Sequence, residues 1–535
     1  MKFNSYISLA YLGIFLPATL FLYAVMPKKV RPYVLLTASL TFFWFISEYL
    51  IFYFITSVLL IWLCALGLDR LKRLQKDRVD TAQTREEKKQ IKKVSSRKQL
   101  TLVVVCILVN IGILAVLKYS PFFLTNLNLL FSTLHIKAEV EVPKYLAPIG
   151  LSFYSLQAVS YIHDVYKEKI SADKNIGRVA LFMCFFPILM EGPICRYTDT
   201  AERLWSGERL HYQSLCFGAQ RIAFGMFKKI IIADRLNVLV NTIFKDYKAF
   251  RFDGGIIALG ALLYTIELYA EFSGTIDVVI GSGEMFGIHI PENFRQPFFA
   301  ASISEFWQRW HITLGTWFRD YIFYPLTMSK HMKKLTKRAR KTLGRHYGPM
   351  PASIIAFFCV WLCNGLWHGA GWEYVFFGMY HFVLISLGSL LLPASNALFD
   401  KLHVDRTKTP YRIFTIVRTF LLVCIGELIF NSRGWHDSLD MLSVLFGNFT
   451  LRSLLDGSVF TLGIDPYDVM ILVAAMIVVL VIGLMKEKGH DPRKTIAAKP
   501  LALRWSIYIA LIVSIVVFGA YGPGYVPIDP IYAKF

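Results

Sequence analysis

Charged residues are scarce in this chain of 535 residues, since Asp, Glu, Lys and Arg make up only 18% of it. Soluble globular proteins carry about 25% charged residues, and here 55% of the residues are hydrophobic. Apolar runs close to the roughly 20 residues that cross a bilayer recur from end to end, and we count about a dozen of them. The scarcity of charge excludes a soluble protein and predicts an all-α polytopic membrane protein.

Several signatures of common enzymes are also absent. The sequence contains neither H-E-x-x-H nor C-x-x-C, so no spacing suggests a tetrahedral metal site. It has no G-x-S-x-G, which excludes the simplest serine hydrolase. The glycines between Gly281 and Gly287 have the wrong spacing for a dinucleotide loop, and no strand precedes them. We therefore expect no bound metal and no bound cofactor.

The positive charge is confined to a few segments. The formal net charge is +21, but the Lys and Arg residues cluster in loops between apolar runs, which is the pattern of cytoplasmic loops in membrane proteins. This distribution predicts contact with anionic headgroups and no nucleic-acid partner. Counting the spans places both termini outside the cell. The whole chain, 1–535, is then a single integral membrane domain with basic cytoplasmic segments at 69–98 and 329–348 and an extracellular loop at 431–466.

Five further stretches carry specific expectations. The stretch 215–232 is expected to span the membrane. Two apolar segments, 256–270 and 276–288, bracket E-F-S-G-T-I-D, so the acids Glu271 and Asp277 are expected close to apolar depth. The aromatic, amphipathic stretch 291–326 is typical of helices that lie in the interface or re-enter the membrane. Residues 352–392 predict a helical hairpin with Trp367 and His368 near its apex.

His368 stands in N-G-L-W-H-G-A-G-W, residues 364–372, where the surrounding sequence predicts lipid. An ionisable side chain at membrane depth is costly and marks a functional site by default. The alternative is a buried histidine that bonds a neighbouring carbonyl. A neutral imidazole can take a proton from a hydroxyl group, small neighbours allow close approach, and Trp367 can exclude water. A transporter could use the same residue as a proton relay, so enzyme and transporter both stay open.

A second histidine, His311, lies in F-W-Q-R-W-H-I-T-L-G-T-W-F-R-D-Y. Together with N-G-L-W-H-G-A-G-W, this block resembles the membrane-bound O-acyltransferase (MBOAT) family, and within it the alginate O-acetyltransferase branch of bacteria. The resemblance covers most of the chain. Further blocks that carry it are G-L-S-F-Y-S-L-Q-A-V-S-Y from Gly150, G-P-I-C-R-Y from Gly192, E-F-S-G-T-I-D from Glu271 and P-E-N-F-R-Q-P-F from Pro291.

The resemblance implies a fold and a set of site residues. The expected fold is a cup of tilted transmembrane and re-entrant helices around a central tunnel. His368 matches the invariant histidine of the family, and His311 matches its second important histidine. Four neighbours are candidates for lining or orienting groups: Trp310, Asp320, Asn364 and Trp367.

The resemblance also implies an activity in the bacterial plasma membrane. The expected reaction moves an acyl group, most simply acetyl, from a cytoplasmic thioester to a hydroxyl acceptor of a cell-surface polysaccharide. The expected donor is acetyl-CoA, with the phosphopantetheine thioester of an acyl carrier protein as the alternative. An SGNH-hydrolase-like partner outside the cell is expected to complete the transfer to the glycan.

Two alternatives accompany this interpretation. Within the same class, the chain could transfer D-alanine from a carrier protein to teichoic acid, and the basic segment 329–348 would then dock the carrier. From another class, it could be a secondary transporter or flippase. Transporters often show internal repeats, and this sequence shows none.

Overall fold

The structure is a computed structural model that describes residues 5–521. Within this range all regular elements are helices, and the one β-bridge, between Phe294 and Trp310, is isolated. Eight helical segments of the described chain are long and apolar enough to cross a membrane. The predicted all-α polytopic class is confirmed. One of these segments, Arg31–Thr81, joins two of the predicted apolar runs, and the apolar stretches at Ala10–Val25 and Ile176–Ile188 form shorter helices.

The described residues divide into two compact units. The first unit contains the chain up to Ala219 and Val279–Pro291, and the second contains Gln220–Val278 and the chain from Glu292. Helices α9 (Tyr212–Met226) and α11 (Gly254–Met285) each contribute to both units. Each unit is described separately, and one membrane domain over the whole chain stays a prediction.

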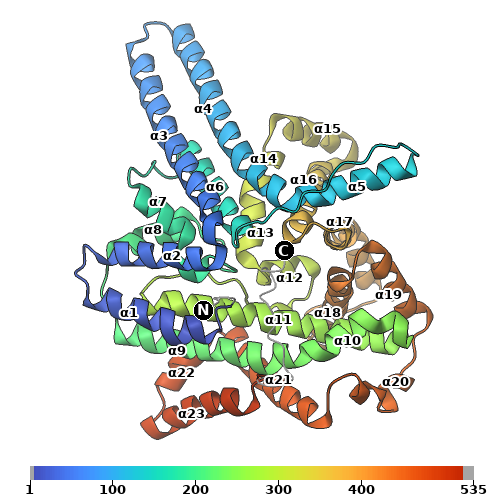
Figure 1. The fold of residues 1–535 in the computed structure, drawn as a ribbon. Coiled ribbons are helices and arrows are strands. Elements are labelled where there is room, and N and C mark those ends of the chain that lie inside the picture. The colour runs from blue at the N-terminus through green and yellow to red at the C-terminus, as the bar shows by residue number, and fades with distance from the viewer. Residues whose placement is uncertain (1–4, 522–535) are drawn as a thin grey trace. The chain divides into compact units, whose positions relative to one another are not determined.

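The first unit is built around a long helical hairpin. Helices α3 and α4 lie side by side (Figure 1), and the hydroxyl of Thr84 caps α4 by accepting a hydrogen bond from the backbone of Glu87. Their charged ends form a helical arm over the basic segment 69–98. The helices of this unit before α9 are η1 Ala10–Phe15, α1 Leu16–Val25, α2 Arg31–Ser47, η2 Glu48–Leu50, α3 Ile51–Thr81, α4 Arg85–Leu114, η3 Ala115–Tyr119, α5 Ser120–Thr133, α6 Leu151–Tyr166, α7 Ile176–Cys184, η4 Phe186–Ile188 and α8 Tyr197–Ser206.

The second unit holds both histidines that the sequence singles out. Its elements beyond α9 and α11 are η5 Phe227–Ala233, α10 Asp234–Phe250, η6 Pro297–Phe299, α12 Ile303–Arg309, α13 Ile312–Phe318, η7 Arg319–Phe323, α14 Tyr324–Thr327, α15 Lys330–Tyr347, α16 Met350–His368, α17 Trp372–Lys401, α18 Thr409–Asn431, α19 Trp435–Gly447, α20 Arg452–Leu455, η8 Ser458–Thr461, α21 Pro466–Glu487, α22 Pro492–Ala497 and α23 Leu501–Phe518. In the stretch 291–326, α13, η7 and α14 form one continuous helical run that is not among the eight segments able to cross a membrane, which agrees with a segment that does not span.

Helices α16 and α17 form the predicted hairpin, with a turn of three residues between them. They contact each other closely at two glycines. A Cβ atom on Gly365 would lie 2.3 Å from the carbonyl oxygen of Tyr374, and one on Gly378 would lie 2.4 Å from that of Trp361. Because real Cβ atoms do not approach backbone oxygens so closely, the hairpin requires glycine at both positions.

Two expectations about the stretches that form α9 and α11 are wrong. Residues 215–232 are not a separate span, because α9 continues through the π-helix η5 into α10. Residues 256–288 do not form two segments, because α11 runs unbroken through Glu271 and Asp277. Both acids are paired with lysines of η5: Lys228 lies 2.8 Å from Asp277, and Lys229 lies 4.0 Å from Glu271. Paired acids do not interrupt a buried helix.

The segment 431–466 also differs from the expected polar loop. It contains α19, α20 and η8, and α19 packs against α17 and α18. Ser438 and Met441 of α19 are buried. The apolar side of a short amphipathic helix therefore extends the core of this unit, and the extracellular position of the segment stays a prediction.

Candidate active site

His368 is the last residue of α16, and its side chain is almost fully enclosed, with 5% of its surface exposed. Aromatic rings surround the imidazole. The ring centres of Trp367, Phe430 and Phe377 lie 5.2, 5.3 and 6.0 Å from it. The apolar pattern that builds the α16–α17 hairpin thus places an imidazole at the end of a helix inside an aromatic cage.

His311 is held by hydrogen bonds at the start of α13, and only 2% of it is exposed. Its Nδ1 atom lies 3.3 Å from Oδ1 of Asn293. That oxygen also accepts hydrogen bonds from the backbone and the hydroxyl of Thr313, at 3.1 and 2.9 Å. Because an amide oxygen only accepts, the contact places the proton of a neutral His311 on Nδ1 and leaves Nε2 as the basic nitrogen.

The backbone around His311 is fixed from both sides. Phe294 and Trp310 form the isolated antiparallel bridge, and the amide of Arg295 donates to the carbonyl of Arg309 over 2.9 Å. His311 itself adopts a left-handed conformation, with φ 46° and ψ 49°. This conformation is uncommon for residues other than glycine, so the two paired segments hold His311 in a conformation that the chain alone does not favour.

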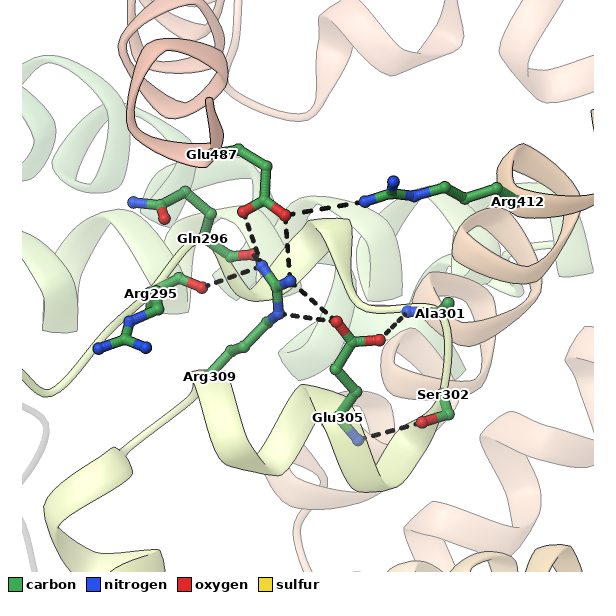
Figure 2. Close-up of polar contacts among 8 residues, drawn as sticks. All are labelled: Arg295, Gln296, Ala301, Ser302, Glu305, Arg309, Arg412 and Glu487. Atoms are coloured by element: carbon green, nitrogen blue, oxygen red, sulfur yellow. Dashed lines mark hydrogen bonds and ion pairs between the residues drawn. The ribbon is translucent and has the colours of Figure 1, made fainter. Parts of the chain in front are cut away.

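Arg309 anchors this arrangement to a distant helix. Its guanidinium donates to both carboxylate oxygens of Glu487 at the end of α21, over 2.8 and 3.0 Å. It also pairs with Glu305 at 2.8 Å and reaches the carbonyl of Gln296 at 3.3 Å. Figure 2 shows Arg309 at the centre of these contacts, with Arg412 approaching Glu487 from α18. Two-pronged pairs of this kind fix orientation as well as distance.

The two histidines face each other across a short gap. Their ring centres are 6.5 Å apart, and the ring planes are inclined by 66°. Trp367 packs on both, with its ring centre 5.5 Å from that of His311, and Phe272 packs on His311 at 4.9 Å. Burial lowers the pKa of His311 well below its ordinary value, and the neighbouring His368 lowers it further. His311 is therefore a neutral imidazole at physiological pH.

The other predicted site residues have different surroundings. Asn364 lies one helical turn before His368 on the same face of α16. It is buried, and its Oδ1 has no hydrogen-bond partner within the described part of the chain. Trp367 packs against both imidazoles. Trp310 instead packs in the neighbouring aromatic cluster, 5.0 Å from Phe294.

Asp320, another predicted site residue, lies in η7. It accepts a hydrogen bond of 2.9 Å from Arg319, whose guanidinium is half exposed. Its role beside the two imidazoles stays a prediction.

Two buried groups were not predicted from the sequence. Asn293 orients His311, but an asparagine 18 residues earlier gives no local signal. His381 of α17 is fully buried, accepts a hydrogen bond of 3.2 Å from the indole of Trp307, and packs 4.8 Å from Phe377, which also contacts His368. The criterion that identified His368, an ionisable residue within an apolar run, would have identified His381 as well.

Within residues 5–521, no three His, Cys, Asp or Glu side chains gather closely enough to hold a metal ion. The described site therefore consists of imidazoles, an amide and aromatic rings. Such a site can hold a polar reactant in a dry environment and move one proton.

Comparisons with known proteins point to one family. The model of the membrane-bound O-acyltransferase family matches residues 40–341, a range that includes His311 and ends before His368. The chain is similar to the probable alginate O-acetylase AlgI of Azotobacter vinelandii, with 33% identity over 448 residues, 83% of this chain and 79% of the relative.

Two further relatives carry other names. The peptidoglycan O-acetyltransferase of Helicobacter pylori is 28% identical over 367 residues, which cover 64% of each chain. The teichoic acid D-alanyltransferase of Bacillus subtilis is 29% identical over 292 residues, 54% of this chain and 69% of the relative.

Proposed function

The chain belongs to the membrane-bound O-acyltransferase family and is an acyltransferase of the membrane, and we propose that it moves an acetyl group from a cytoplasmic thioester to a hydroxyl group of a cell-surface polysaccharide. The bacterial plasma membrane is the proposed location. The names of the relatives in Azotobacter vinelandii and Helicobacter pylori, both O-acetyl transfer enzymes, support acetyl as the transferred group.

The buried pair of His311 and His368 is the observation that carries this proposal. His368 takes the proton of the acceptor hydroxyl while the oxygen attacks the thioester carbonyl. The tetrahedral intermediate then collapses to the ester and expels the thiolate, which takes up the proton. Trp367 and the surrounding rings keep out water that would hydrolyse the thioester. His311, neutral and fixed by Asn293, positions the donor through Nε2 or assists the proton's movement.

Acetyl-CoA is the proposed donor, and the phosphopantetheine thioester of a carrier protein is the alternative. The similarity to a teichoic acid D-alanyltransferase supports the carrier-protein thioester as the alternative donor. Helix α15 carries all eight Lys and Arg residues of 329–346 and no acid, and it would attract an acidic carrier. The proposed acceptor side includes an SGNH-hydrolase-like partner outside the cell, which completes the transfer to the glycan.

The test compares donors directly. Purified protein is incubated with radiolabelled acetyl-CoA or with an acyl-loaded carrier protein, and label in the acceptor is counted. We expect label from acetyl-CoA, none with His368→Ala, and full transfer with His211→Ala, which alters an exposed histidine. Label only from the carrier protein would replace the proposed donor, and full activity of His368→Ala would overturn the assignment of the base.

The transporter alternative has its own test. In proteoliposomes a transporter or flippase would move an unmodified solute across the bilayer, whereas the proposed enzyme transfers label covalently. Flux without covalent acylation would favour the transporter.

A further inference from the structure

The second unit contains a cavity of about 990 Å³ that is separate from the histidine pair. One wall is the face of α21 that carries Met470, Ala474, Val478, Ile482 and Lys486, which follow one another at intervals of four residues. This stripe is about 24 Å long, from the rise of an α-helix. The opposite walls come from α23 and from the end of α9 with η5, through Ile507, Leu511, Ser514, Phe518, Phe224, Phe227 and Ile231. We refer to this cavity as the α21–α23 groove.

The groove is apolar along its length and charged at one end. The charged end is lined by Arg221, Arg295, Arg309, Lys486 and Arg493 together with Asp277, Glu292, Glu487 and Asp491. Most of these charges compensate one another, because Arg221 pairs with Asp277 and Glu292, and Arg309 pairs with Glu487. This distribution of charged and apolar lining residues fits a ligand with one polar end and a long apolar body.

Two cations at this end form no ion pair with any described residue. Among the described residues, neither Arg295 nor Lys486 has a carboxylate within 4 Å. Figure 2 shows that Arg295 gives only its backbone carbonyl to Arg309, while its guanidinium points away from the network. Both side chains are exposed and border the groove. They are available to an anion that enters from the charged end.

We propose that the α21–α23 groove binds one anionic phospholipid of the bilayer, with its phosphate at Arg295 and Lys486 and its acyl chains along α21 and α23. The groove's length of about 24 Å exceeds half of the roughly 30 Å hydrocarbon core, which is enough for the chains of one leaflet. Only 11% of the apolar window of α21 and 6% of that of α23 are buried by protein, against 67% for α11. Lipid therefore reaches both helices from the side.

A bound lipid would complete the packing beside the histidine pair. Phe294, which lines the groove, packs 5.0 Å from Phe272, and Phe272 packs 4.9 Å from His311. Arg309 also borders the groove and fixes the segment that precedes His311. A lipid in the groove would therefore stabilise the packing around His311 without contacting either imidazole.

The test measures retained lipid and uses no acyl donor, so its outcome is independent of the proposed reaction. The full-length protein is equilibrated with vesicles containing equal amounts of phosphatidylglycerol and phosphatidylcholine, extracted in mild detergent, and analysed by native mass spectrometry. We expect one retained phosphatidylglycerol per protein. Each cation near the membrane surface strengthens the binding of an anionic lipid about five-fold. The double variant Arg295→Gln and Lys486→Gln should therefore reduce the preference for phosphatidylglycerol over phosphatidylcholine about 25-fold.

Matched variants separate binding from folding. Ala474→Trp fills the groove and should abolish retention, whereas Ile477→Trp alters an exposed position of α21 that does not line it. Lys494→Gln removes an exposed charge of α22 outside the groove, and Arg295→Lys should restore the headgroup preference. Equal retention of both lipids by the wild type, or wild-type retention by Ala474→Trp, would overturn the proposal. Displacement of the lipid by acetyl-CoA would assign the groove to the donor and overturn it too.

Discussion

The two histidines of the site are held in different ways. His368 ends a long apolar helix, and its position follows from the packing of α16 against α17 through Gly365 and Gly378. His311 lies between two short helices, and its position depends on the hydrogen bond that it donates to Asn293 and on paired backbone segments. Apolar packing thus positions His368, which we call the packed side of the site. A network of hydrogen bonds positions His311, which we call the polar side.

The largest effect should come from removing the imidazole on the packed side. His368→Ala should lower acyl transfer by about 10³-fold or more, because general base catalysis contributes about 10² to 10⁴-fold. The protein should remain folded in the membrane, since a helix end tolerates alanine. The measurement is the initial rate with labelled donor, alongside size-exclusion profiles of both proteins. A loss below ten-fold would exclude His368 as the base.

On the polar side, Asn293→Ala should lower the rate by about 10²-fold, the effect of misplacing a reacting group by about 1 Å. The change frees the Nδ1 atom of His311 and deprives Thr313 of its acceptor. Thr313→Val is the matched control, because it removes one donor to Asn293 and leaves the contact with His311. Rates of the two variants at saturating donor should differ clearly, and equal rates would show that the network does not orient His311.

The packed side should also respond to added volume. Gly378→Ala introduces a Cβ against the carbonyl of Trp361 and should lower the free energy of unfolding by about 1–3 kcal/mol, as overpacking does. Gly388 lies in the same helix, and a Cβ atom there would meet no heavy atom within 4 Å, so Gly388→Ala should stabilise by about 0.5–1 kcal/mol. Thermal unfolding in detergent measures both, and equal shifts would contradict the close contact.

The smallest effect is a dependence of stability on pH. Because burial lowers the pKa of His311, the folded protein keeps this imidazole neutral at pH values where the unfolded chain, with a pKa of about 6.5, binds a proton. Stability should therefore fall as the pH drops below about 6.5, by at most about 1.4 kcal/mol per pH unit from this residue. Unfolding midpoints between pH 7.5 and 5.5 should fall less for His311→Asn than for the wild type. His211→Ala should retain the wild-type slope.

The same contrast explains what the sequence could predict. The α16–α17 hairpin and the importance of His368 follow from an apolar run interrupted by one ionisable residue, which is local information.

Features that depend on contacts between distant residues were not predictable in this way. Nothing near Asn293 in the sequence indicates that its amide orients His311. The sequence showed the acids Glu271 and Asp277 close to apolar depth but not their lysine partners, which lie on η5, more than forty residues earlier in the chain. A polar residue in an apolar stretch can mark a boundary, a site or a buried pair, and only the fold distinguishes the three.

The left-handed backbone of His311 has a consequence for mutagenesis. Replacing it with alanine removes the imidazole and also places a residue in a conformation that costs it roughly 1–2 kcal/mol, so loss of activity would combine two causes. Asparagine accepts this conformation more readily than most residues. The rate of His311→Asn therefore reports on the imidazole, and the additional loss in His311→Ala reports on the backbone. A scan with alanine alone would overstate the chemical importance of this side chain.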